Sequence, residues 1–278
     1  MSIKEKLESL GRNSIQLKIA GKETHKLGAT RFGGKPDVPS DFVWPTYEGE
    51  SYDHVVKDRP LTFLAQFNCA ELAQFDKEHL LPDHGLLSFF YETDTQCWGY
   101  DPKDEGCARV YWFKDISGLK QVAFPADLPE DCRFPALSIG MSAGRSVMPP
   151  ADAEMAWQTD IDYDDFETIR RRMGCGEPEN SSKLLGWADP IQGSMAAECQ
   201  LVTRGYDMGG DTDAPERELI YAEEHSIDDW TLLFQLDTVE DGHFYLMFGD
   251  CGRIYFYIRK EDLAARRFDR IWLILQCC

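Results

Sequence analysis

The sequence has no long apolar segment and few basic residues. No stretch approaches the 18 consecutive apolar residues that a membrane-spanning helix requires. The 29 Lys and Arg residues are outnumbered by 49 Asp and Glu residues, which gives a formal net charge of −20 at pH 7. A chain this acidic repels phosphate backbones and anionic lipid surfaces. We therefore expect neither nucleic acid nor a membrane as its partner, whereas a cationic partner stays possible.

The spacing of the nine cysteines and six histidines is typical of neither a metal site nor a disulfide framework. There is no Cys-x-x-Cys pair, and no His lies at ligand spacing from a Cys or another His. The N-terminal residues alternate charged and apolar side chains and lack the apolar core of a secretion signal. These features predict a cytoplasmic protein with free thiols and with no metal or other cofactor.

Helical and strand-like patterns alternate along the chain, which predicts an α+β fold. Residues 1–10 have the pattern of a short amphipathic helix, and apolar–polar alternation predicts a strand over 14–20. The segment 159–173 begins with aspartates and ends with three arginines, a distribution that suits the dipole of a helix. The apolar run 270–278 predicts a buried terminal strand.

Comparison of the chain with itself reveals an apparent internal repeat. Three pairs of segments recur in the same order: 61–68 with 230–237, 85–91 with 242–248, and 107–113 with 251–257. Thr, Leu and Gln recur in the first pair, and Cys, Arg and Tyr in the third. Strand alternation places Phe63 and Leu232 at equivalent positions on a buried face.

The repeat predicts a single domain over residues 1–278, built from two similar and mainly antiparallel β units. The two halves, about 14–148 and 183–278, are joined by an acidic and partly helical connector. With short flanking helices, they would pack about a pseudo-two-fold axis.

The same segments resemble the YwqG-like family, a bacterial group with a domain of unknown function. The residues that carry the resemblance include Phe63-Leu-Ala-Gln66, Pro190-Ile-Gln192-Gly193, Leu233-Phe-Gln-Leu-Asp237 and Gly249-Asp250-Cys251-Gly252-Arg253-Ile-Tyr255-Phe256. The resemblance extends over roughly Gly28 to the C-terminus. It implies a cytoplasmic α+β protein without an established activity, so it supplies no catalytic residues.

One segment matches the Gly-x-Ser-x-Gly motif of serine hydrolases, in which Ser142 would be the nucleophile. The motif requires a strand before the serine and a helix after it, but Pro149 and Pro150 follow too soon for an ordinary helix start. A hydrolase would also need His225 or His243 within hydrogen-bond reach of the serine. We expect instead a turn formed by small residues.

Matched polar residues on the repeated strands form the second set of candidates: Gln66, Arg109 and Tyr111 in the first half, and Gln235, Arg253 and Tyr255 in the second. An arginine within an aromatic strand is costly to bury unless it is paired. Each arginine therefore either stabilises its own unit or, with the glutamine, lines one of two twin polar pockets that bind a ligand or partner.

The function predicted from these observations is a binding or protein-interaction module rather than an enzyme. Two alternatives remain open at this point. One is a serine hydrolase that uses Ser142, and the other is a small-ligand binder whose site lies in the cleft between the halves.

Overall fold

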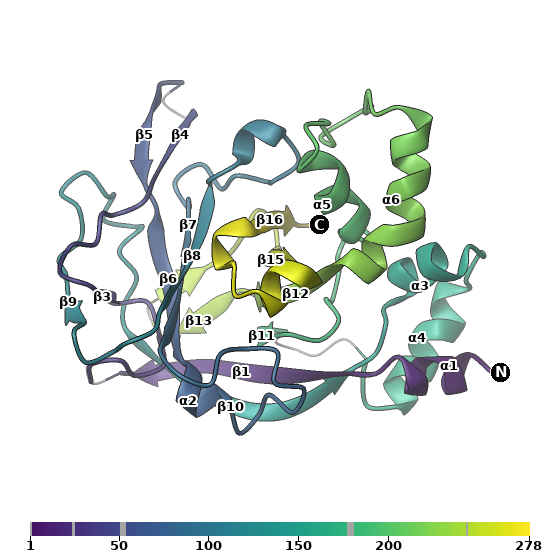
Figure 1. Ribbon diagram of the computed structural model, residues 1–278, viewed down its shortest axis with the longest axis horizontal. Helices are drawn as coiled ribbons and strands as arrows, with labels where there is room; N and C mark the ends of the chain where they lie inside the picture. The colour runs from purple at the N-terminus through teal and green to yellow at the C-terminus, as the bar shows by residue number, and fades with distance from the viewer. Residues whose placement is uncertain (1, 24–25, 51–53, 177–180, 243) are drawn as a thin grey trace.

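The computed structural model describes residues 2–23, 26–50, 54–176, 181–242 and 244–278 (Figure 1). Within these residues, ten strands form one antiparallel sheet in the order β16-β15-β12-β11-β1-β10-β2-β6-β7-β8. The strands of this sheet are β1 (Arg12–Lys22), β2 (Arg31–Phe32), β6 (Thr62–Asn68), β7 (Leu86–Tyr91), β8 (Ala108–Phe113), β10 (Leu137–Ser146), β11 (Lys183–Leu184), β12 (Trp230–Leu236), β15 (Arg253–Arg259) and β16 (Ile271–Gln276).

Three two-stranded sheets and several helices complete the described structure. One sheet pairs β3 (Asp37–Val38) with β9 (Lys120–Gln121), which are far apart in the sequence. The other two are hairpins, which pair β4 (Thr46–Glu50) with β5 (Val56–Pro60) and β13 (Val239–Asp241) with β14 (Phe244–Leu246). The helices are α1 (Ile3–Ser9), α2 (Cys69–Leu72), α3 (Pro150–Trp157), α4 (Tyr163–Arg172), α5 (Ala196–Val202), α6 (Glu216–Asp229), α7 (Lys260–Ala264), and the 3-10 turns η1 (Pro102–Asp104) and η2 (Phe268–Arg270). No helix in the described part of the chain is both long and apolar enough to cross a bilayer.

Several local predictions are confirmed. The N-terminal helix forms as α1, and the terminal apolar run forms the buried strand β16. Helix α4 begins after Asp162, whose side chain accepts a hydrogen bond from the backbone N–H of Asp165 at 3.0 Å. Its last turn carries the three arginines, as the helix dipole favours.

The long central strands β1 and β10 divide the sheet into two sides. Strand β1 comes from the start of the chain but pairs with β11, whereas β10 pairs with β2. The two central strands pair with each other from Arg12 opposite Ser146 to Lys22 opposite Leu137. Each side of this central pair carries four strands. The chain therefore crosses between the two sides of the sheet through its longest strands.

The predicted matching of the second and third repeated segments is wrong. Strand β15 pairs with β12, as β7 pairs with β6, and β16 occupies the next position, as β8 does. Within the segment matched to β7, Phe244–Leu246 form β14, which pairs with β13 in a separate hairpin. A glycine followed by apolar and aromatic residues suits many short strands, so this local pattern could not identify the pairing partner.

A bulge in each of the two matched strands also overturns the predicted alternation. The register between β6 and β7 shifts between Phe63 and Ala65, and that between β12 and β15 shifts between Leu232 and Phe234. An extra residue reverses the direction of the side chains that follow it. Phe63 consequently packs in a small cluster with Phe90, whereas Ala65 and Phe67 belong to the main core. Phe63 and Leu232 are both buried, as predicted.

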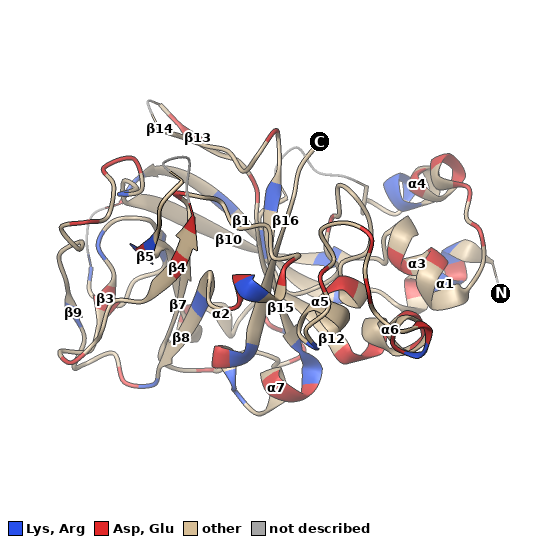
Figure 2. Cartoon of the chain, turned by 90° about the horizontal axis from the view of Figure 1, so that it is seen from above, with Lys and Arg blue, Asp and Glu red and all other residues tan. Residues whose placement is uncertain are grey.

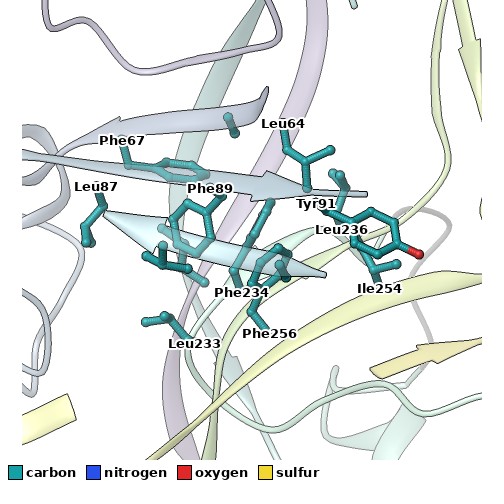
Figure 3. Close-up of a cluster of buried hydrophobic side chains, with 14 of the residues drawn as sticks. Leu64, Phe67, Leu87, Phe89, Tyr91, Leu233, Phe234, Leu236, Ile254 and Phe256 are labelled. Atoms are coloured by element: carbon teal, nitrogen blue, oxygen red, sulfur yellow. The ribbon is translucent and has the colours of Figure 1, made fainter. Parts of the chain in front are cut away.

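The main core lies where β6 and β7 face β12 and β15 (Figure 3). Four phenylalanine rings from these strands meet at its centre. The Phe89 and Phe234 ring centroids are 4.8 Å apart, and the Phe89 and Phe256 centroids are 5.3 Å apart. Phe67 contacts Phe234 edge-on at 5.5 Å. Such aromatic packing joins β6 and β7 to β12 and β15, which lie far from them in the sequence.

The outer edge of β16 is covered by the segment before η1. The backbone N–H of Leu275 donates to the carbonyl of Trp98 at 2.9 Å, and the Trp272 indole donates to the carbonyl of Gly99 at 2.7 Å. Gly99 has φ 81°, and a Cβ atom there would lie 1.7 Å from the carbonyl oxygen of Leu273. Only glycine permits this approach, which protects the edge strand from pairing with other chains.

Gly99→Ala is expected to destabilise the protein by about 2 kcal/mol or more, because the new methyl group overlaps backbone and the left-handed conformation disfavours alanine. Urea unfolding monitored by tryptophan fluorescence measures the change. Gly118→Ala is the control, since a Cβ there meets nothing within 4 Å. Equal stability of the two variants would contradict the proposed close packing.

Candidate functional site

A group of buried polar side chains surrounds Asp189 on the second side of the sheet. We call it the Asp189 cluster, and it consists of Lys183, Asp189, Gln235, Asp237, Arg253 and Tyr255. Lys183 forms an ion pair with Asp189 through Oδ2, and Gln235 Nε2 donates to the same oxygen at 3.1 Å. The backbone N–H of Asp189 donates to Gln235 Oε1 at 2.9 Å. The carboxylate is therefore held by a cation and by the amide nitrogen of Gln235, whose amide oxygen accepts from the backbone of the same aspartate.

Three of the residues predicted from sequence meet in this cluster. Arg253 Nε lies 3.1 Å from Asp237 Oδ2, and Arg253 Nη1 donates to the carbonyl oxygen of Asp189 at 3.1 Å. The Tyr255 hydroxyl donates to the same carbonyl at 2.8 Å. Gln235 contacts the side chain of Asp189 from the neighbouring strand. These predicted residues are thus joined by an aspartate that the sequence did not single out.

A smaller and similar group surrounds Asp37 on the first side of the sheet. The Asp37 cluster consists of Arg31, Asp37 and Gln66, each no more than 1% exposed. Arg31 Nη1 lies 2.9 Å from Asp37 Oδ2, and Gln66 Nε2 donates to that oxygen at 2.8 Å. The backbone N–H of Asp37 donates to Gln66 Oε1 at 3.1 Å. The contacts of Asp37 with its cation and glutamine match those of Asp189.

Arg109 and Tyr111 lie outside the Asp37 cluster, contrary to the predicted twin pocket. Strand β7 separates β8 from β6, so Arg109 lies opposite Phe90 rather than beside Gln66. Its guanidinium donates to the carbonyl of Ala108 at 3.3 Å and lines a different cavity of about 440 Å³. Tyr111 packs edge-on against Phe90, with ring centroids 5.7 Å apart. The cation beside Gln66 is Arg31 instead.

The structure places Ser142 in the middle of strand β10, opposite Gln16 of β1. The nucleophile elbow does not form, because the backbone continues as a strand to Ser146. His225 lies on α6, where its Nδ1 atom is 3.0 Å from the carbonyl oxygen of Tyr221. His243 lies outside the described residues. The expected turn at 140–144 is also wrong, since small residues here permit the close pairing of two long strands.

A pocket of about 280 Å³ adjoins the Asp189 cluster. Pro149, Tyr163, Pro190 and Ile191 line its apolar side, and Glu167, Arg170 and Asp189 its polar side. Helices α3 and α4 and the loop after Asp189 bring these residues together (Figure 1). The Asp37 cluster is closed to solvent, whereas the side chain of Asp189 retains 11% of its exposure.

Arg170 lines this pocket, and the sequence analysis did not identify it as a site residue. Its side chain is only 6% exposed and forms an ion pair with Glu167. Its Nη2 atom lies 3.8 Å from Asp189 Oδ1. Within the part of the chain that the structure describes, its Nε atom is buried and has no hydrogen-bond partner. Arg170 lies one helical turn after Phe166, so the two side chains share a face of α4, and both are buried. The sequence signal for a buried Arg170 was this spacing from an apolar residue.

The pocket lies within the region matched by a protein-family model. The model is described as a domain of unknown function (DUF1963), and it matches residues 30–277. The chain belongs to this family. No curated protein matches the sequence. Both aspartate clusters and both central bulges of this DUF1963 domain fall inside the matched region.

Helix α3 begins at the pocket and carries a buried carboxyl group in its first turn. Pro149 provides the N-cap without a side-chain hydrogen bond, and Asp152 is 4% exposed. Burial raises the pKa of Asp152 to about 6, although Ser194, Arg12 and Arg170 act in the opposite direction. Burial likewise lowers the pKa of the Lys183 ammonium, against the attraction of Asp189. Asp152 and Lys183 are therefore poorly hydrated, and their polar contacts are strengthened.

Arg253→Met is expected to destabilise the protein by about 3–5 kcal/mol, because it leaves Asp237 buried without its cation. Arg109→Met is the matched control, and we expect it to cost less than about 1 kcal/mol since Arg109 is partly exposed and bonds to a strand carbonyl. Chemical denaturation of both variants measures the difference. Equal losses would show that the two arginines have the same structural role after all.

The raised pKa of Asp152 predicts a pH-dependent stability. The folded protein binds a proton at Asp152 more tightly than the unfolded chain, whose aspartates titrate near pH ~3.9. This contribution is complete at low pH and is lost as pH rises through about 6. Asp152→Asn should therefore match the wild type near pH ~4 and exceed its stability at pH ~8 by at most about 3 kcal/mol.

Denaturation at a series of pH values measures this effect, and the exposed Asp58 provides the control. Asp58→Asn should leave the pH profile of stability unchanged. A constant difference between Asp152→Asn and the wild type at all pH values would exclude a raised pKa.

Proposed function

We propose that this DUF1963 protein is a non-catalytic binding module that takes a carboxylate, or a similar oxyanion, into the pocket beside Arg170. The observation that carries the proposal is that Arg170, only 6% exposed, lines this pocket and that its Nε atom has no hydrogen-bond partner among the described residues. A buried donor without an acceptor costs about 1–3 kcal/mol, and a ligand that accepts its hydrogen bond recovers that free energy.

The start of helix α3 supports an anionic ligand group. Ala151 lines the pocket in the first turn of α3, where free backbone N–H groups and the helix dipole favour negative charge. The nearby charges are nearly balanced, since Glu167 and Asp189 accompany Arg170 and Lys183. Binding would then depend on directed hydrogen bonds more than on net attraction, which favours modest affinity and clear chemical selectivity.

The comparison of the two clusters supports the choice of this pocket. Each cluster contains an aspartate, a cation and a glutamine with matching contacts. Only the Asp189 cluster adds Arg253, Tyr255 and the nearby Arg170. We infer that the shared contacts stabilise each side of the sheet and that the additional groups adapt one side for binding.

We further propose that the fold is an internal duplication in which the two repeats exchange their first strands. The repeats would be β1, β2, β6, β7, β8 and β10, β11, β12, β15, β16. This division moves β10 to the second repeat, whereas the predicted halves, about 14–148 and 183–278, had it in the first. The backbone N–H of Gly33 donates to the carbonyl of Leu64, and that of Leu185 donates to the carbonyl of Leu233. Both acceptor residues lie at the bulges, so the equivalent bonds support the proposed correspondence.

The register of the central strands supports a pseudo-two-fold axis. Gln16 lies opposite Lys183 as Ser138 lies opposite Arg31, which makes Gln16 and Ser138 equivalent under the proposal. Two residues further along, Lys18 becomes equivalent to Gly140. These two residues are themselves paired, as a two-fold axis between β1 and β10 requires.

Other parts of the sequence-based interpretation remain proposals. Membership of the YwqG-like group rests on the resemblance described above, and a cytoplasmic location rests on composition. A cationic protein partner suits the formal charge of −20. The hydrolase alternative loses its support because Ser142 lies within a strand. The cleft alternative corresponds to the 440 Å³ cavity at Arg109, which both halves line.

The test uses NMR of the Arg170 Nε–H group, with N-acetyl-leucine as the carboxylate probe and N-acetyl-leucinamide as its neutral match. The carboxylate should shift the Arg170 signal saturably, and the amide should bind at least about tenfold more weakly. Equal responses to the two compounds, or no response to either at millimolar concentration, would overturn the proposal.

A pocket-blocking variant avoids any change to the buried ion pairs. Ala151→Phe adds bulk at the rim, so binding of N-acetyl-leucine should weaken by about tenfold or more. Ala151→Ser keeps the pocket open and is the control. Thermal unfolding of both variants establishes that they are folded before the titration.

A further inference from the structure

A wider groove adjoins the pocket beside Arg170. Its volume is about 930 Å³, and it shares Ala151, Tyr163 and Gly193 with the pocket. The two spaces are therefore lined in part by the same residues. Together they are much larger than a free amino acid or a single side chain requires.

The groove is acidic. Glu154, Asp160 and Glu223 line it, and none of its described lining residues is Lys or Arg. Asp160 and Glu223 are exposed, while Glu154 is fixed by a 2.9 Å hydrogen bond from the Tyr163 hydroxyl. These carboxylates come from α3, α6 and the segment between α3 and α4, where acidic residues are visible in Figure 2. Positive charge is favoured in the groove, next to a pocket whose buried Arg170 favours an oxyanion.

We propose that the ligand is the carboxy-terminal end of a basic peptide. The terminal carboxylate lies against the guanidinium of Arg170, and the last side chain packs against Pro149 and Ile191. The preceding Lys or Arg side chains lie in the acidic groove. This inference rests on the proposed function, which supplies the carboxylate site, and it adds the chemistry of the rest of the ligand.

The size of the adjoining groove and the neighbouring carboxylate site favour a peptide end over a small basic molecule. Capture of a terminal carboxylate by backbone and arginine donors is a recurring mode of peptide recognition. An extended peptide rises by about 3.3 Å per residue, so two or three residues extend from the pocket into the neighbouring groove. The exposed carboxylates add attraction that salt screens, whereas the buried contact with Arg170 is screened much less.

The test measures fluorescence anisotropy with a labelled peptide, fluorescein-Lys-Arg-Lys-Ala-Leu with a free carboxylate. One comparison peptide ends in an amide, and another has Gln in place of each basic residue. The free-acid basic peptide should bind best. Loss of the carboxylate should weaken binding about tenfold, and loss of the basic residues should weaken it several-fold and reduce its salt dependence.

Variants locate the effect on the protein. Asp160→Asn and Glu223→Gln should each weaken the basic peptide about two- to fivefold and leave the Gln peptide unchanged. Glu240→Gln, an exposed acid on β13, is the matched control and should have no effect. A groove variant that is no weaker than Glu240→Gln contradicts the local role of the groove.

The outcomes separate this inference from the proposed function. If the Gln peptide binds as tightly as the basic one, the basic-peptide inference is wrong, and the carboxylate pocket stands. If the amidated peptide binds as tightly as the free acid, the carboxylate site itself is wrong. Equal weakening by Glu240→Gln would show attraction by the net charge alone and would overturn the groove.

Discussion

A buried aspartate held by a cation and a glutamine is the interaction on which each side of the sheet depends. Asp37 and Asp189 each follow a short strand and a turn with two left-handed residues, Gly33-Gly34 in one case and Leu185-Gly186 in the other. The backbone N–H of each aspartate donates to the side-chain oxygen of a glutamine on the next strand of the sheet. Because a buried carboxylate is stable only with its partners, this arrangement holds the turn and both strands in one geometry.

Elements that depend on interactions between residues close in the sequence were predicted correctly, whereas features that depend on distant residues were not. Helices α1 and α4 and strand β16 depend on periodicity, capping and local composition, which the sequence displays directly. The bulges at Leu64 and Leu233 leave no sign in the alternation of apolar residues, because both faces of these strands are buried. Strand pairing was missed for a similar reason, since a short apolar strand fits many partners.

The site was only partly predictable for the same physical reasons. Gln235, Arg253 and Tyr255 were found because they recur in the segments matched by sequence and because an arginine on an aromatic strand needs a partner. Asp189 and Arg170 looked like ordinary residues of a loop and a helix end, and only the tertiary fold brings them to the same place. The error at Arg109 arose from matching sequence motifs, whereas the strand order places an intervening strand between it and Gln66.

The difference between the two clusters is an argument about free energy. The Asp37 cluster holds its turn with one cation and one carboxylate, both almost fully buried. The Asp189 cluster and Arg170 together place three cations with Asp189, Asp237 and Glu167 in a similar position. Each added ion costs several kcal/mol of desolvation before its partners offset it. The equivalent turn at Asp37 forms with a single ion pair. Stability of the turn therefore does not account for the extra ions around Asp189. Arg170 and Asp189 line the adjoining pocket, so the extra ions lie where the proposed ligand binds.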